Sequence, residues 1–109
     1  MSHATTPRWE TMRTPETRAV ENALRKVFQQ ADAYRYNSAS IRVRVIDPRF
    51  EAKSAAQRDA LVERVLKTLS ERTQADIINL LTLAPNEIAD SAKTLLVNEE
   101  FDDPSPSGL

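Results

Sequence analysis

The stretch IRVRVI, residues 41–46, is the feature that most restricts the fold. Ile41, Val43 and Val45 alternate strictly with Arg42 and Arg44, which is the period-two pattern of a strand with one buried face. The Asp-Pro pair that follows ends the strand, because proline cannot donate to a sheet ladder. A strand with one buried face needs a covering layer, so the flanking segments have to supply it.

An amphipathic helix is predicted on each side of this strand. Thr14 and Pro15 form a suitable N-cap and first helical residue, and apolar residues then recur at spacings of three and four as far as Ala31. The second helix is expected to begin at Ser54, because Ser54 and Gln57 fit the capping-box pattern. It is expected to fray near residues 71–73.

Residues 75–85, ADIINLLTLAP, fit either a helix or a buried strand by periodicity. We favour a strand over Ile77–Leu83, because the run is short and Pro85 stops it. A right-handed crossover through the second helix would make this strand parallel to residues 41–46, or its neighbour in a mixed sheet. A third helix is expected to open at residues 85–87.

This order of elements predicts an α/β (α+β) fold. We expect a small sandwich in which the helices pack on one face of a two- or three-stranded sheet. The pattern leaves open whether a strand forms within residues 31–38. Two strands alone are marginally stable, so a third strand or a homodimer through a sheet edge would complete the sheet. Strand addition is expected at the edge of residues 41–46.

A single domain over residues 14–97 is expected between two disordered tails. Residues 1–13 lack periodicity, although Trp9 is more typical of a side chain that docks on the domain. Residues 98–109 are acidic and rich in Pro and Ser. The chain has no run of about 18 apolar residues, so no membrane span is predicted. Without a signal-like segment, a cytoplasmic protein is the default expectation.

Three residue types that carry much of protein chemistry are nearly missing. The chain has no cysteine, one histidine (His3) and one glycine (Gly108). These counts exclude thiolate nucleophiles, cysteine or histidine metal clusters and glycine-rich phosphate loops from the predicted domain. We expect no enzyme activity, cofactor or metal. The remaining candidates for acid–base work or a hard cation are Asp59 and Asp76, if the fold brings them together.

Positive charge is concentrated in the middle of the chain. Residues 35–58 contain six basic side chains and two acidic ones, whereas residues 98–103 (NEEFDD) carry four acidic ones. A KH-like, nucleic-acid-binding regulator that uses a basic strand face is therefore an alternative function. Against it stand the net charge of −1 and the lack of glycine for a G-x-x-G clamp. The residues of this alternative site are Arg42, Arg44, Arg49, Lys53 and Arg58.

The stretch from the strand through the second helix resembles the BolA family. Members of that family read as an alternating strand, then F-x-G-K-S, then a helix with R-H-x-x-V. The matching residues here are Phe50, Lys53, Ser54, Arg58 and Val62, with the same spacing. Residues 84–87 (APNE) fill the place of the family's T-P-x-E element. The resemblance covers roughly residues 20–90 and implies a BolA-like fold, which is similar to that of KH domains.

BolA proteins are associated with monothiol glutaredoxins, which they bind across a shared iron–sulfur cluster. Asp59 stands where the family has its R-H histidine, and approximately Asp76 where it has a second one. Carboxylates substitute poorly for thiolate or imidazole at such a cluster. The resemblance thus implies a non-enzymatic adaptor or regulatory binding protein that contacts a partner, such as a monothiol glutaredoxin, without ligating a cluster itself. The partner-binding residues that it implies are Phe50, Lys53, Ser54 and Arg58.

Overall fold

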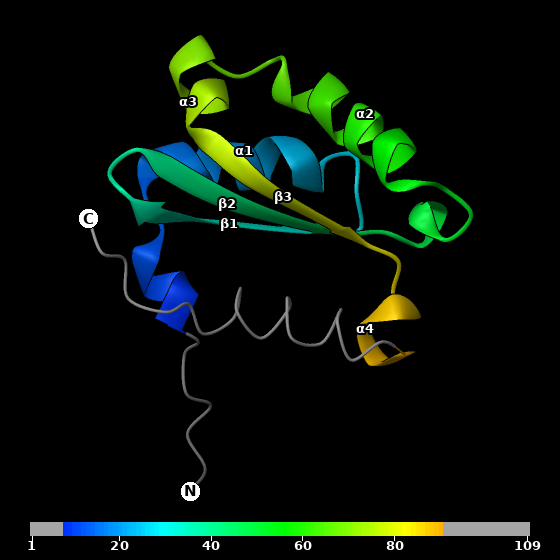
Figure 1. Cartoon of the computed structure of the whole chain (residues 1–109). Coiled ribbons are helices and arrows are strands. Elements are labelled where there is room, and N and C mark those ends of the chain that lie inside the picture. Colours follow the sequence, from blue (N-terminus) through cyan, green and yellow to red (C-terminus); the bar gives the residue numbers. More distant parts are fainter. Residues whose placement is uncertain (1–7, 91–109) are drawn as a thin grey trace, which may run out of the picture.

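The centre of the molecule is a three-stranded sheet in the order β1–β2–β3 (Figure 1). A computed structural model describes residues 8–90 of the chain. The strands are β1 (Gln30–Asn37), β2 (Ser40–Ile46) and β3 (Ile77–Leu83). The acidic tail predicted at 98–109, the predicted third helix beyond Asp90 and residues 1–7 of the predicted N-terminal tail lie outside the described residues.

The sheet is mixed, and its pairing settles what the sequence left open. β1 and β2 form an antiparallel hairpin, with Gln30 opposite Ile46 and Asn37 opposite Ser40. β2 and β3 run parallel, which their connection through helices allows. Both predicted strands are confirmed, and a strand does form within residues 31–38.

β2 is the central strand of the sheet, paired on both sides. The expectation that residues 41–46 offer an edge for strand addition is therefore wrong. The hairpin partner β1, which the sequence pattern left undecided, occupies that side. The outer strands of the sheet are β1 and β3.

Three helices cover one face of the sheet (Figure 1): α1 (Pro15–Arg25), α2 (Ala55–Leu66) and α3 (Glu71–Asp76). Both predicted N-caps are confirmed. The hydroxyls of Thr14 and Ser54 accept hydrogen bonds from the N–H groups three residues on, at 3.3 and 3.2 Å. In each case, the side chain of the third helical residue accepts a hydrogen bond from the N–H of the cap residue. These paired bonds fix where each helix begins.

α1 ends at Arg25 and not at Ala31, where the apolar stripe ends. The N–H of Gln29 donates to the Asp47 carboxylate at 3.0 Å, across a sequence distance that no local pattern shows. β1 begins at the next residue. Ala31 is fully buried, as the stripe predicts, but it lies in a strand.

α2 is also shorter than predicted, because a new helix begins near residue 71. Ser70 caps α3 by accepting a hydrogen bond from the Thr73 N–H at 3.2 Å. The Gln74 side chain donates to the Leu69 carbonyl at 2.8 Å and closes the connection. The chain therefore turns after α2 and continues through α3 directly into β3.

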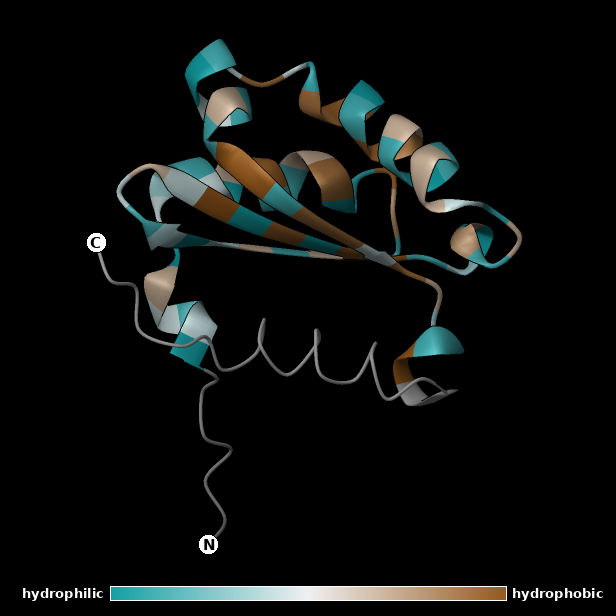
Figure 2. Ribbon diagram, viewed as in Figure 1, coloured by the Kyte–Doolittle hydropathy of each residue, from teal (hydrophilic) through white to brown (hydrophobic). Residues whose placement is uncertain are grey.

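The helices and the sheet enclose one hydrophobic core. Figure 2 shows hydrophobic residues gathered on β2, β3 and the middle of α1. The rings of Phe28 and Phe50 lie 5.6 Å apart within it. Ile41, Val43 and Val45 point into this core, as the alternation predicts. The other buried members are Val20, Leu24, Ala31, Ala33, Val62, Leu66 and Ala84.

A 3-10 helix, η1 (Arg8–Met12), covers part of the opposite sheet face (Figure 1). Trp9 is 3% exposed, and its ring lies 6.2 Å from the ring of Tyr34. The Arg13 guanidinium stacks over the indole at 4.5 Å and bonds the buried Glu21 carboxylate at 2.9 Å. Residues 8–12 are therefore a docked helix and not the disordered segment expected, while docking of Trp9 on the domain is confirmed.

Two short helices complete the described fold. η2 (Pro48–Phe50) joins β2 to the turn before α2, and α4 (Glu87–Asp90) follows β3 at the place predicted for a third helix. Over residues 8–90, no helix has the length and apolar character needed to cross a membrane.

Candidate functional site

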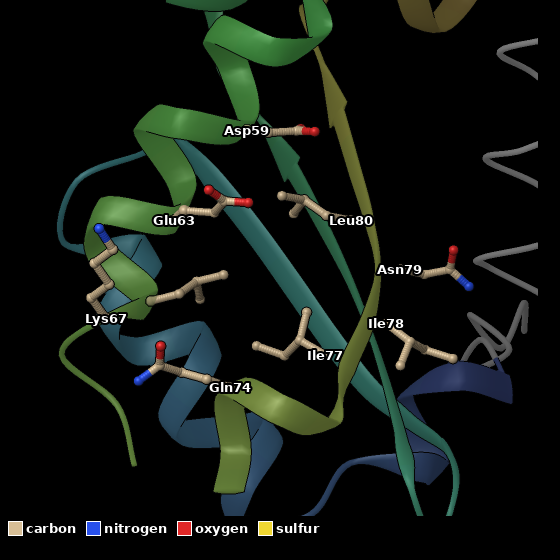
Figure 3. A pocket seen from close by; sticks show the side chains of 9 residues that line it. Asp59, Glu63, Lys67, Gln74, Ile77, Ile78, Asn79 and Leu80 are labelled. Carbon is tan, nitrogen blue, oxygen red and sulfur yellow. The ribbon is translucent and has the colours of Figure 1, made fainter. Parts of the chain in front are cut away.

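A groove of about 590 Å³ runs between α2 and the outer edge of β3 (Figure 3). One wall is formed by α2 from Asp59 to Leu66 together with its C-cap residue Lys67. The other wall is formed by residues 77–80 of β3, and Gln74 of α3 lies at one end. This volume lies in the range of ligand sites, roughly 300–1,000 Å³. The groove therefore combines a helix wall with a strand edge.

The β3 wall presents backbone that has no ladder partner. Successive residues of a strand direct their N–H and C=O groups to opposite sides. The Leu83 carbonyl accepts from the Asp47 N–H at 3.0 Å, on the β2 side. Leu81 therefore also faces β2, while Leu80 and Thr82 face outward. Within residues 8–90, no strand pairs with this outer side.

Arg58 closes one end of the open edge. Its Nη1 donates to the outward carbonyl of Thr82 at 3.1 Å. The same guanidinium bonds both carboxylate oxygens of Glu87, at 2.6 and 3.0 Å, and its Nε donates to the Lys53 carbonyl at 3.0 Å. The unpaired part of the edge is thus limited to Ile78–Leu80.

A β-bulge at Ile78 shapes the other end of the edge. Ile41 pairs with Ile77 and Arg42 with Asn79, so Ile78 is the extra residue. The extra residue of a bulge has no ladder partner, and the Ile78 side chain is 60% exposed. Figure 3 shows Ile77 pointing toward α2, whereas Ile78 and Asn79 point to the other side.

The α2 wall carries two carboxylates. Asp59 and Glu63 are four residues apart and so share one face of the helix. In Figure 3 both point toward β3, whereas the Lys67 side chain runs alongside α2. Burial, and after it the charge of Glu63, raises the pKa of Asp59. Neither carboxylate has an ion-pair partner in the part of the chain that the structure describes.

The four residues predicted to bind a partner lie at the junction before α2 and in its first turns. Phe50 is fully buried in the core, so its side chain has no surface for a partner. Ser54 is occupied by the helix cap. Arg58 is 8% exposed and lies 5.8 Å from the Phe50 ring. Lys53 is half-buried. Of the four, only Arg58 adjoins the groove edge, where it acts as a closing group.

Two of the basic residues lie on the sheet face that points away from the helices. Arg42 donates to the Tyr34 hydroxyl at 2.9 Å. Arg44 bonds the Asp32 carboxylate at 3.0 Å and is 6% exposed. The outer face of β2 is therefore covered in part, and not a row of solvated charges.

The remaining basic residues of the alternative site lie elsewhere. Arg49 bonds the Asp47 carboxylate through its Nε at 2.9 Å, and Arg58 bonds Glu87. Arg58 in turn holds the pKa of Glu87 below its usual value. The five predicted cations are thus spread over different surfaces, and the charges of Arg44, Arg49 and Arg58 are paired with carboxylates.

Asp59 and Asp76, the two aspartates considered for acid–base work or a hard cation, have different surroundings. Asp76 forms an ion pair with Arg35 at 2.9 Å, whereas Asp59 faces the groove. The structure does not place both carboxylates on the groove wall. Among residues 8–90, no group of three or more Asp, Glu, His or Cys side chains is arranged to hold a metal ion.

Sequence reasoning singled out Asp59 but not the groove that it faces. The four-residue spacing of Asp59 and Glu63 predicts that they share a helix face. The exposure of Ile78 and the outward direction of the Leu80 backbone could not be predicted, because strand order and bulges depend on contacts between residues far apart in the chain. No family model matches the sequence, and no curated protein matches it.

Proposed function

We propose that this protein is a non-enzymatic binding protein that takes up an extended segment of a partner protein by strand addition at β3. The observation that carries the proposal is the outer edge of β3 at residues 78–80, which no strand within residues 8–90 pairs, beside a groove walled by α2. In strand addition, main-chain hydrogen bonds supply affinity, and side-chain pockets supply specificity. The α2 wall provides such a pocket on one side of the added strand.

The geometry suits a short segment. Ile78–Leu80 spans three residues of edge, each about 3.3 Å long. Each main-chain hydrogen bond adds only about 0.5–1.5 kcal/mol net, so backbone pairing alone gives weak binding. Side-chain contacts with the groove, and with the exposed Ile78, have to supply most of the affinity.

The resemblance to the BolA family supports the same class of function and suggests a monothiol glutaredoxin as one partner. The motif residues themselves have structural duties: Phe50 in the core, Ser54 in the helix cap and Arg58 between α2 and the end of β3. We therefore place the contact surface at the β3 edge and not on these motif residues.

Nucleic-acid binding has less support. Phosphate recognition needs cations gathered on one surface, whereas Arg44, Arg49 and Arg58 are each held by a carboxylate. The groove wall itself presents Asp59 and Glu63, which repel phosphates.

The proposal is tested by selecting displayed random peptides on the purified protein and measuring their affinities by fluorescence anisotropy. Ile78→Pro places a ring at the bulge on the outer edge of β3, where the register of the ladder shifts. Ile77 before it is already extended, with φ −76° and ψ 103°, as a residue before proline should be. We expect Ile78→Pro to weaken selected peptides about tenfold.

Ile78→Ala is the matched control, because it keeps the N–H and loses only side-chain surface. It should weaken binding less than the proline variant does. Circular dichroism melts verify that both variants fold. Amide NMR shifts on peptide addition should centre on residues 78–80. The proposal fails if no peptide is selected, or if Ile78→Pro binds selected peptides as tightly as the unaltered protein.

A further inference from the structure

Asp59, which is half-buried, is an exception to a pattern in this molecule, and the exposed Glu63 lies one turn further along α2. Elsewhere, carboxylates that lie near or within the core have guanidinium partners. These pairs are Glu21 with Arg13, Asp32 with Arg44, Asp47 with Arg49 and Glu87 with Arg58. Asp59 and Glu63 have none among residues 8–90. They also share a helix face, where like charges four residues apart disfavour the helix.

The surroundings of Asp59 show what this arrangement lacks. Its carboxyl group is partly buried, and burial together with Glu63 raises its pKa. A positive charge between the two side chains would offset both effects, since it compensates desolvation and separates like charges. Lys67 lines the same groove, but within residues 8–90 it forms no ion pair with Asp59 or Glu63.

The floor of the groove suits the stem of a long cationic side chain. Leu66, Ile77 and Leu80 line the groove between the carboxylates and the strand edge. Ile77 and Leu80 are also packed against the hydrophobic core, which holds them in place. Lysine and arginine lay their methylene stems along such apolar surface while the charged end reaches polar groups.

We propose that the segment docked on β3 carries a lysine or arginine that points at α2, with its charged end between Asp59 and Glu63. This inference rests on the proposed function and adds its specificity: the preferred partner segment is extended and basic at one position. Its methylenes lie over Leu66, Ile77 and Leu80. Phosphates and acidic peptides are disfavoured by the same two carboxylates.

The test uses the displayed random peptides on three proteins: the unaltered chain, the double variant Asp59→Asn/Glu63→Gln, and Glu51→Gln. Glu51 is exposed and lies outside the groove, so the third protein controls for the loss of a carboxylate charge elsewhere on the surface. Selection on the unaltered protein should enrich Lys or Arg at one position. A selected peptide should bind about tenfold more weakly to the double variant and unchanged to Glu51→Gln.

A peptide in which norleucine replaces the selected lysine closes a double-mutant cycle. The norleucine peptide should bind the unaltered protein more weakly than the lysine peptide does. The two peptides should bind the double variant with similar affinity. The amide substitutions keep side-chain shape and remove an uncompensated charge, so melting temperatures should not fall. The attraction should also weaken with added salt.

The outcomes separate this inference from the proposed function. Peptides that bind, respond to Ile78→Pro and show no basic preference would overturn the cation inference and leave strand addition standing. Failure to select any peptide would overturn both. Both proposals would also be overturned if a short oligouridine RNA bound the unaltered protein but not Ile78→Pro. The groove would then bind nucleic acid.

Discussion

At the scale of single residues, Asp47 shows how one side chain ties three elements together. Its carboxylate accepts from the N–H of Gln29 at 3.0 Å and from the N–H of Arg49 at 2.8 Å, and it pairs with the Arg49 guanidinium. The bonds from Arg49, the largest cause, lower the pKa of Asp47 to about 2. This group thus links the residue before β1 to the end of β2 and caps η2.

We expect Asp47→Asn to destabilise the fold by about 2 kcal/mol near neutral pH. The folded-state pKa of about 2 lies below the ordinary value of 3.8. Stability from the carboxylate is therefore present above that ordinary value and is lost as the pH falls through the folded-state pKa. Urea unfolding at several pH values measures it: the gap between variant and unaltered protein should narrow toward pH 2. A gap that does not change with pH would contradict this explanation.

Local residue chemistry was predictable, and long-range chemistry was not. Ser54 with Gln57 forms the expected capping box, since both partners lie within four residues. Arg58 was expected to be a solvated or partner-binding cation. Its actual partners, Glu87 and the Thr82 carbonyl, lie 29 and 24 residues away. No local pattern indicates such a bond.

At the scale of elements, the length of an apolar run and the proline that ends it predicted secondary structure better than periodicity did. Residues 77–83 were ambiguous by period, but their short length and Pro85 correctly predicted a strand. The apolar stripe correctly predicted the buried face of α1. Buried apolar residues of the same stripe, however, continue after the helix has ended. Tertiary burial extends an apolar pattern beyond the element that it helps to recognise. The groove needed the position of β3 relative to α2, which neither element encodes alone.

η1 was not predicted, because residues 1–13 lack the periodicity of a regular element. Trp9 buries its ring against Tyr34 and beneath Arg13. We expect Trp9→Ala to destabilise the protein by about 3 kcal/mol, as for other large-to-small changes at buried aromatics. Far-UV circular dichroism during urea unfolding measures the change.

Trp9→Phe serves as the control, because it keeps an apolar ring and should cost much less. If Trp9→Ala unfolds at the same urea concentration as the unaltered protein, η1 does not contribute to the fold in solution.

At the scale of the whole molecule, one core lies between the helices and the sheet, and a smaller cluster with Trp9 lies on the other face. The two faces of the sheet therefore have different roles. The helix face holds both the main core and the groove, and Ile77 and Leu80 of the groove pack against that core. The α+β layering was predictable from element order, whereas the strand at the free edge was not.

We expect the protein to be monomeric at micromolar concentration, near neutral pH and in low salt. A homodimer that joins two β3 edges around a twofold axis would bring the Asp59 and Glu63 side chains of both copies to one junction. Like charges there oppose association. Sedimentation velocity measures the mass, and the double variant Asp59→Asn/Glu63→Gln should associate more readily. A stable dimer of the unaltered chain that Ile78→Pro dissociates would contradict this prediction.

The short length of the open edge has a consequence for solubility. An exposed, regular strand is a template on which further copies can stack into a growing sheet. Here the bulge at Ile78 twists one end out of register, and Arg58 occupies the carbonyl of Thr82 at the other. What is left of this edge would accommodate the proposed guest of a few residues but is too short to template a growing sheet. On the β3 side, the sheet would thus offer a receptive edge without seeding fibres.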